Sequence, residues 1–141
     1  TDGHEFGLAP GQMAPVAFLP AADDGWEVLA TQAGGERPMV LRKKFKDWTS
    51  VYSAVPHLSP KVLRDLGRTA GLHVYCESDD GCYPSSVMVG LHAITPGAKT
   101  LCFPKKQERF YDLVTGKTLA TQTDRVELQA EFGKTYLIGW E

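Results

Sequence analysis

Two histidines and two cysteines in the second half of the chain are residue types that bind metal ions. They are His73, Cys76, Cys82 and His92. Side chains alternate between the two faces of a strand, so His73 and Cys76 would point in opposite directions. No C-x-x-C or H-x-x-x-H pair brings two ligands together. We therefore expect these residues to be ordinary strand residues, with no bound metal and no other cofactor.

The segment Glu77-Ser78-Asp79-Asp80-Gly81 concentrates carboxylates in a short loop. Oxygen ligands this dense suit calcium, but the EF-hand pattern with its final glutamate is missing. Glycoside hydrolysis needs two carboxylates that face a cleft about 5–10 Å apart. Two adjacent aspartates on one turn do not supply that geometry. We expect a solvated turn, and a small hydrolase that uses Asp79 and Asp80 is the least favoured of the alternatives.

No serine lies in a context typical of nucleophilic catalysis. Ser53, Ser85 and Ser86 lack the G-x-S-x-G sequence that presents a nucleophile on a sharp turn. Together with the arrangement of the carboxylates, this predicts that the chain carries no catalytic residue of its own. It leaves open whether a larger protein containing the chain is an enzyme.

Aromatic residues are numerous enough to suggest binding of sugar rings, which stack on aromatic faces and hydrogen-bond at a polar edge. Aromatic residues in strands more often belong to the core. Trp48 and Tyr83 are the best candidates for carbohydrate binding, because both lie beside turns. The aromatic residues considered are Trp26, Trp48, Tyr52, Tyr75, Tyr83, Phe110, Tyr111, Tyr136 and Trp140.

Composition narrows the class of protein. Of 141 residues, 43% are hydrophobic and 23% are charged, which is typical of a folded globular chain. A net charge of −2 argues against a nucleic-acid partner, since binding to phosphates favours a basic surface. No apolar run approaches the roughly 18 residues of a membrane span. The polar N-terminus without an initiator Met predicts a piece cut from a longer chain, whose compartment is not indicated.

Local signals divide the chain into three parts. Residues 1–14 predict a lead-in or linker, residues 15–71 a β-meander plus a helix, and residues 72–141 a small C-terminal β-sandwich. The helix should begin at Ser59-Pro60, with serine as its N-cap, and end at Gly71. The fold class is mainly β: a small antiparallel β-sandwich preceded by a meander and one α-helix.

Short apolar runs separated by turn residues predict the strands. The basic run from Arg42 to Lys46 predicts a solvated sheet edge or a contact with an acidic neighbouring domain. Cys76 and Cys82 flank a polar loop, and they are either free thiols or a disulfide in an oxidising compartment. The predicted strands are residues 15–20, 26–31, 38–45, 48–53, 72–76, 87–94, 99–103, 108–112, 117–121, 125–129 and 135–140.

Several of these segments resemble a known family. The strands Pro38–Phe45 and Thr49–Ser53, followed by the helix S-P-x-x-L-R-x-L-x-R-x-A-G-L-H, resemble the end of the glutamine-amidotransferase-like trimerisation domain in β-galactosidases of glycoside hydrolase family 42 and related multidomain hydrolases. In that family a small C-terminal β-sandwich follows, which is similar to Val74–Trp140 here. The hairpin signal Asp112-Leu113-Val114-Thr115-Gly116 belongs to this part. Lys46-Asp47-Trp48 departs from the family, where the turn contains glycine.

The resemblance implies a non-catalytic C-terminal region of a larger, bacterial carbohydrate-active enzyme, because the family's catalytic acid and nucleophile lie in a barrel domain that these residues do not contain. Its expected role is to pack against the catalytic domain of the same parent chain or to assist formation of a homo-oligomer. The alternative is a carbohydrate-binding module that uses exposed aromatic residues. Neither function calls for nucleic acid or a membrane.

Overall fold

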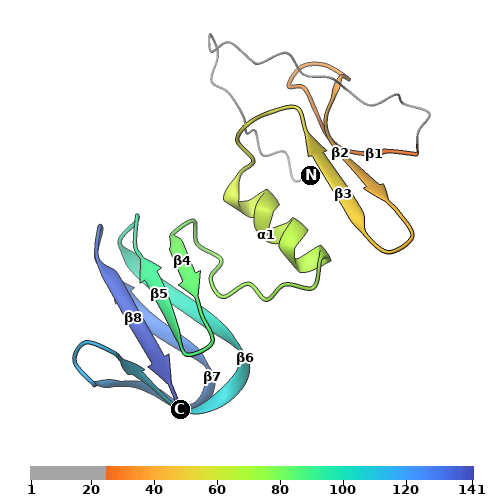
Figure 1. Ribbon diagram of the computed structural model, residues 1–141. Helices are drawn as coiled ribbons and strands as arrows, with labels where there is room; N and C mark the ends of the chain where they lie inside the picture. Colours follow the sequence, from red (N-terminus) through yellow and green to blue (C-terminus); the bar gives the residue numbers. More distant parts are fainter. Residues whose placement is uncertain (1–24) are drawn as a thin grey trace. The chain divides into compact units, whose positions relative to one another are not determined.

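The computed structural model describes residues 25–141; the lead-in predicted over residues 1–14 and the strand predicted over residues 15–20 lie outside this range. The chain divides into two compact units between Ser59 and Pro60, and each is considered by itself (Figure 1). Within the described range the architecture is mainly β, with two antiparallel sheets and one helix, which confirms the predicted fold class. No helix in this range is long and apolar enough to cross a membrane.

The described part of the first unit is an antiparallel meander of three strands. They are β1 (Glu27–Thr31), β2 (Pro38–Lys44) and β3 (Thr49–Ser53), in the spatial order β1-β2-β3. Gly34 in the first turn has φ 72°, a left-handed conformation that glycine adopts without steric cost. The three strands therefore lie where the local turn and strand signals of the sequence predict them.

The basic run from Arg42 to Lys44 lies in β2, the central strand of the meander, and Lys46 lies in the turn after it, so the expectation that the run marks a sheet edge is wrong. Its side chains alternate between the two faces of the sheet. Arg42 pairs with Glu27 on β1, with 2.7 Å between Nη2 and Oε2. The Lys43 ammonium lies 5.7 Å from the ring centroid of Trp26 and 5.6 Å from that of Phe45.

Helix α1 (Pro60–Thr69) begins where the sequence predicts and ends through Gly71. Gly71 has φ 81°, and its N–H donates to the Arg68 carbonyl at 2.9 Å. The N–H of Leu72 donates to the Gly67 carbonyl at 2.9 Å, which completes a Schellman motif. None of the helix residues is buried. By its contacts the helix belongs to the second unit, although the sequence places it beside the meander.

The second unit is built on one sheet of five strands, in the spatial order β4-β5-β8-β6-β7. Two of these strands are long and bend, so that the sheet folds over its own core as a small sandwich (Figure 1). The strands are β4 (Gly81–Pro84), β5 (Met88–His92), β6 (Gly97–Asp112), β7 (Thr118–Ala130) and β8 (Thr135–Trp140).

Each of the long strands replaces two predicted ones: β6 covers the strands predicted over residues 99–103 and 108–112, and β7 those over 117–121 and 125–129. The pairing of β6 with β7 shifts between Cys102 and Gln107, so a bulge bends the strands without ending them. The strand predicted over residues 72–76 is reduced to a single bridge between Cys76 and Leu101. Strand β4 begins at Gly81, where a turn was predicted.

The core of the second unit lies between the two halves of the bent sheet. Leu101 and Val126 come from the half in which the start of β6 pairs with the end of β7. Phe110 and Ile138 come from the other half, where β6 pairs with β8. All four are fully buried and belong to one cluster, completed by Cys76, Val89, Leu91 and Phe103.

The Asp112-Leu113-Val114-Thr115-Gly116 segment forms the turn between β6 and β7. Asp112 Oδ1 accepts hydrogen bonds from the N–H groups of Val114 and Thr115 at 2.9 and 2.8 Å. Gly116 has φ 71°, and its N–H donates to the Asp112 carbonyl. The hydrogen bonds from Thr115 and Val114 lower the pKa of the Asp112 carboxyl. This is a structural turn, in which the aspartate satisfies the backbone.

Candidate functional site

Trp48 lies in the turn between β2 and β3, where the Phe45 N–H donates to its carbonyl at 2.8 Å. Its indole stacks on the Phe45 ring, with 4.1 Å between ring centroids and 7° between ring planes. The residue is 56% exposed. One face of the indole is therefore held by Phe45 while much of the ring stays open to water, as a sugar-stacking platform requires.

Tyr83 lies on β4 in the second unit and is 67% exposed. Its neighbour Cys82 packs against the core, so Tyr83 points to the outer face of the sheet. The two predicted carbohydrate-binding residues thus belong to different units, and each is an exposed aromatic on its own element.

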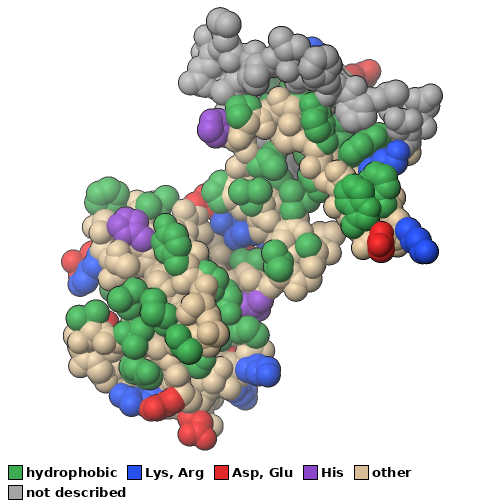
Figure 2. Space-filling model, in the orientation of Figure 1, with side chains coloured by type: hydrophobic (Ala, Val, Ile, Leu, Met, Phe, Trp, Pro, Cys, Tyr) green, Lys and Arg blue, Asp and Glu red, His purple; other side chains and the backbone are tan. Residues whose placement is uncertain are grey.

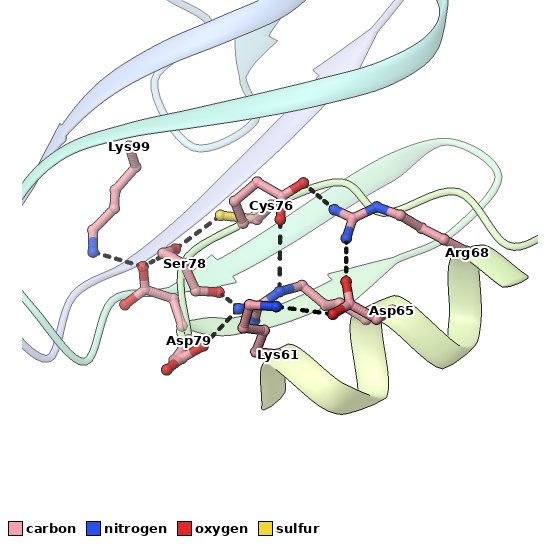
Figure 3. A network of polar contacts seen from close by, with 10 residues as sticks. Lys61, Asp65, Arg68, Cys76, Ser78, Asp79 and Lys99 are labelled. Carbon is pink, nitrogen blue, oxygen red and sulfur yellow. Dashed lines mark hydrogen bonds and ion pairs between the residues drawn. The ribbon is translucent and has the colours of Figure 1, made fainter. Parts of the chain in front are cut away.

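The acidic loop, residues 77–80, is bound by basic residues of helix α1 (Figure 3). Arg64 donates to the Ser78 carbonyl at 3.2 Å and to the Asp79 carboxylate at 2.9 Å. Arg68 forms an ion pair with Glu77. The carboxylates of Glu77 and Asp79 attach the helix to the sandwich while staying exposed to water, as the predicted solvated turn requires; Asp80 alone departs from that prediction.

Asp80 turns inward and forms an ion pair with Lys99 on β6, with 2.8 Å between Nζ and Oδ2. The exposed fractions of the two side chains are 0% and 6%. Oδ1 accepts from the Ile94 N–H at 2.8 Å, and Ser78 donates to Oδ2. Lys99 also donates to Thr95 Oγ1 at 2.6 Å. This buried pair fastens the acidic loop to β6 and to the turn before it.

Burial alone would raise the pKa of the Asp80 carboxyl, but hydrogen bonds from Lys99, Ser78 and the backbone of residues 94 and 95 outweigh it and lower the pKa to about 2. Because this lies below the ordinary value of 3.8, folding favours the ionised carboxylate. The resulting stabilisation, roughly 2 kcal/mol, is complete above about pH 4 and is lost as the pH falls through about 2.

We therefore expect acid to weaken the second unit through this group. The free energy of unfolding in urea, measured from about pH 5 to about pH 2, should fall more steeply for the unaltered chain than for Asp80→Asn. The same acid slope in both proteins would contradict the assignment.

Comparison with solved structures finds a likeness to the crystal structure of the β-galactosidase from Bacillus circulans sp. alkalophilus, with a TM-score of 0.55 and 16% sequence identity. The likeness covers 96% of this chain and 23% of that enzyme, so the chain spans less than a quarter of its length. No family model matches the sequence, and no curated protein matches it. At this identity the likeness shows a shared fold alone.

The histidines and cysteines serve separate local contacts. His73 donates from Nε2 to the Cys102 carbonyl at 2.8 Å, and His92 Nδ1 lies 2.9 Å from Thr135 Oγ1 on β8. All three cysteines are free. Burial raises the pKa of the Cys82 thiol to about 11, with a further contribution from Cys76, which keeps Cys82 protonated near neutral pH. Over residues 25–141 no three His, Cys, Asp or Glu side chains converge on a common point.

The buried ion pair is the polar feature that the sequence analysis missed. A signal for it exists in β6, where Lys99, Leu101 and Phe103 share one face by strand alternation. A lysine on the same face as two core residues requires a buried acidic partner. Its partner, Asp80, lies in the acidic segment Glu77–Gly81, which looks solvated in the sequence. Only the three-dimensional fold brings Asp80 next to β6.

Proposed function

We propose that the chain is a non-catalytic accessory region of a larger carbohydrate-active enzyme of the β-galactosidase kind. It packs against the catalytic domain of the same parent chain or assists its oligomerisation. The observation that carries this proposal is the coverage of the fold likeness, 96% of this chain against 23% of a β-galactosidase. A likeness that covers almost all of this chain but under a quarter of a larger hydrolase is what a supporting region of such an enzyme would show.

The use of the carboxylates favours this role. A glycosidase needs two carboxylates free to face the scissile bond. In the acidic loop, Glu77 and Asp79 bind the arginines of α1, and Asp80 is buried against Lys99. Asp80 is buried away from any substrate, and Glu77 and Asp79 each already pair with an arginine, so the loop presents no two unpaired carboxylates.

Exposed apolar side chains also favour packing against a further domain. Exposed large apolar residues are typical of a surface that another domain covers where they form one contiguous patch. Here they occur on α1, after it, and on loops of the sandwich. The most exposed aliphatic residues are Leu63, Leu72, Val87 and Val114.

The reading frame upstream of Thr1 tests the proposal first. It should encode a (β/α)8-barrel pattern, and the whole protein should hydrolyse an aryl β-galactoside that the 141-residue chain alone leaves intact. Deleting residues 60–141 from the whole protein should lower its Tm without changing which glycoside it hydrolyses. Turnover by the chain alone, or an upstream frame without a hydrolase domain, would overturn the proposal.

Carbohydrate binding is a second candidate, favoured by the exposed Phe45–Trp48 stack. Oligosaccharides should quench tryptophan fluorescence saturably, and Trp48→Ala should weaken binding about tenfold, because a stacked aromatic contributes on the order of 1 kcal/mol. Trp26→Phe is the matched control and should bind as the unaltered chain does. Quenching that does not saturate, or that survives in Trp48→Ala, would exclude Trp48 as the binding platform.

A further inference from the structure

The outer face of the sandwich carries two cross-strand rows over β4, β5 and β8. Val89, Leu91 and Ile138 point into the core, so the residues that alternate with them lie on the opposite, outer face. Figure 2 shows hydrophobic side chains gathered over the part of the second unit where Figure 1 draws β5 and β8. The strand register defines a first row, Gly81-His92-Thr135, and a second row beside it, Tyr83-Gly90-Leu137.

Gly81 and Gly90 have no side chains, which leaves room on this face for the Tyr83 ring. A Cβ atom on Gly81 would lie 3.1 Å from the Tyr83 hydroxyl oxygen and 3.2 Å from its Cε2. A Cβ atom on Gly90 would lie 3.7 Å from the Tyr83 Cβ. The distal end of the tyrosine ring therefore folds back over Gly81, and the residue is still 67% exposed. The ring is supported from beneath by the sheet and open to water above.

A polar pair lies in the row next to Tyr83. His92 Nδ1 and Thr135 Oγ1 are 2.9 Å apart, on the adjacent strands β5 and β8. This contact fixes the orientation of the imidazole, and Nε2 has no hydrogen-bond partner among residues 25–141. Groups held by strands are placed more rigidly than groups on loops. The rows thus combine a supported aromatic ring with an oriented nitrogen and a hydroxyl.

We propose that this face is a binding subsite for one neutral pyranose ring. The apolar C–H face of the sugar stacks on Tyr83, and its hydroxyl groups hydrogen-bond to His92 Nε2 and Thr135 Oγ1. Neither row contains a carboxylate, a lysine or an arginine, so nothing in them favours a charged ligand. The ligand class, a β-galactoside, rests on the proposed function, whereas the placement of the three side chains does not.

Titration of the isotope-labelled 141-residue chain with methyl β-galactopyranoside, followed by NMR, tests the subsite. The signals of the Tyr83 ring, the His92 imidazole and the Thr135 amide should shift together and saturate, with a Kd on the order of 1 mM, as one supported ring and two hydrogen bonds allow. Tyr83→Ala should weaken binding at least tenfold. His92→Gln should weaken it several-fold, because it alters the hydrogen bond to the sugar but leaves the Tyr83 ring in place.

Two controls separate a sugar subsite from a nonspecific surface effect. Tyr83→Phe keeps the ring and should bind within about twofold of the unaltered chain. Val114→Ala alters an exposed side chain in the turn between β6 and β7, outside both rows, and should leave the shifts at Tyr83 unchanged. Unaltered signals of Val89 and Ile138 in each variant will show that the sandwich is folded, so a loss of binding cannot be attributed to unfolding.

The outcomes distinguish this inference from the proposed function. Shifts that are absent at tens of millimolar sugar, or that persist in both Tyr83→Ala and His92→Gln, would overturn the subsite. An accessory role would survive that result, because its own test is the upstream reading frame and the effect of deletion. Conversely, a chain without a hydrolase partner that still binds the glycoside through Tyr83 would retain the subsite and lose the proposed function.

Discussion

Replacing Asp80 with alanine is expected to lower the free energy of unfolding of the second unit by about 3–5 kcal/mol. The carboxylate is completely buried and lies 2.8 Å from the Lys99 ammonium, whose side chain is nearly buried too. Without Asp80, Lys99 keeps only Thr95 Oγ1 as its described partner. The N–H of Ile94 also loses its acceptor. An unpaired buried charge and an unsatisfied donor both oppose folding.

Urea unfolding followed through the NMR signals of Val89 and Ile138 measures this loss in the second unit alone. Asp79→Ala is the matched control, because its carboxylate is exposed and its ion pair with Arg64 should contribute at most about 1 kcal/mol. A double variant, Asp80→Asn with Lys99→Met, should recover part of the stability by removing the charge as well. Equal losses in Asp80→Ala and Asp79→Ala would show that the buried pair has no special weight.

The elements governed by local chemistry are those that the sequence predicts well. Helix α1 begins at the serine–proline pair and ends through a left-handed glycine, and both signals act over a few residues. The Asp112–Gly116 turn is likewise decided within itself. The fold class follows, because the spacing of strands and turns is local information.

Features that depend on distant residues were not predictable. Pro104 and Asp124 look like ends of strands, yet β6 and β7 continue past them because the two strands pair with each other around a shared bulge. The basic run predicts a solvated sheet edge or a contact with an acidic neighbouring domain, and the first is wrong because a single sequence does not reveal the order of strands in a sheet. Asp80 illustrates the same limit, since it lies in a loop and its partner Lys99 lies nineteen positions away on β6.

The candidate binding residues are an intermediate case. Position beside a turn correctly predicted that Trp48 and Tyr83 are exposed. The position beside a turn does not predict that the Phe45 ring stacks on Trp48, because that contact depends on how the hairpin closes. Nor did it place His92 and Thr135 in the row next to Tyr83, since that requires the register of β5 with β8. Whether these aromatics bind a sugar stays a prediction.

The hydrophobic core of the sandwich should tolerate truncation poorly at Phe110. This side chain is fully buried at the point where β6 pairs with β8, opposite Trp140. Its ring centroid lies 4.3 Å from that of Phe103. Phe110→Ala removes a large ring from between the two halves of the bent sheet and leaves a cavity that the paired strands cannot close. We expect a loss of about 3–5 kcal/mol.

The matched control is Phe132→Ala, which removes the same ring at a position that is 76% exposed in the turn before β8. Its effect should stay within about 0.5 kcal/mol, because little apolar surface returns to water. The contrast between two identical substitutions measures how far the bent sheet depends on its own core. If Phe110→Ala cost no more than Phe132→Ala, the two halves of the sheet would not be packed on Phe110, and the second unit could not be described as a sandwich.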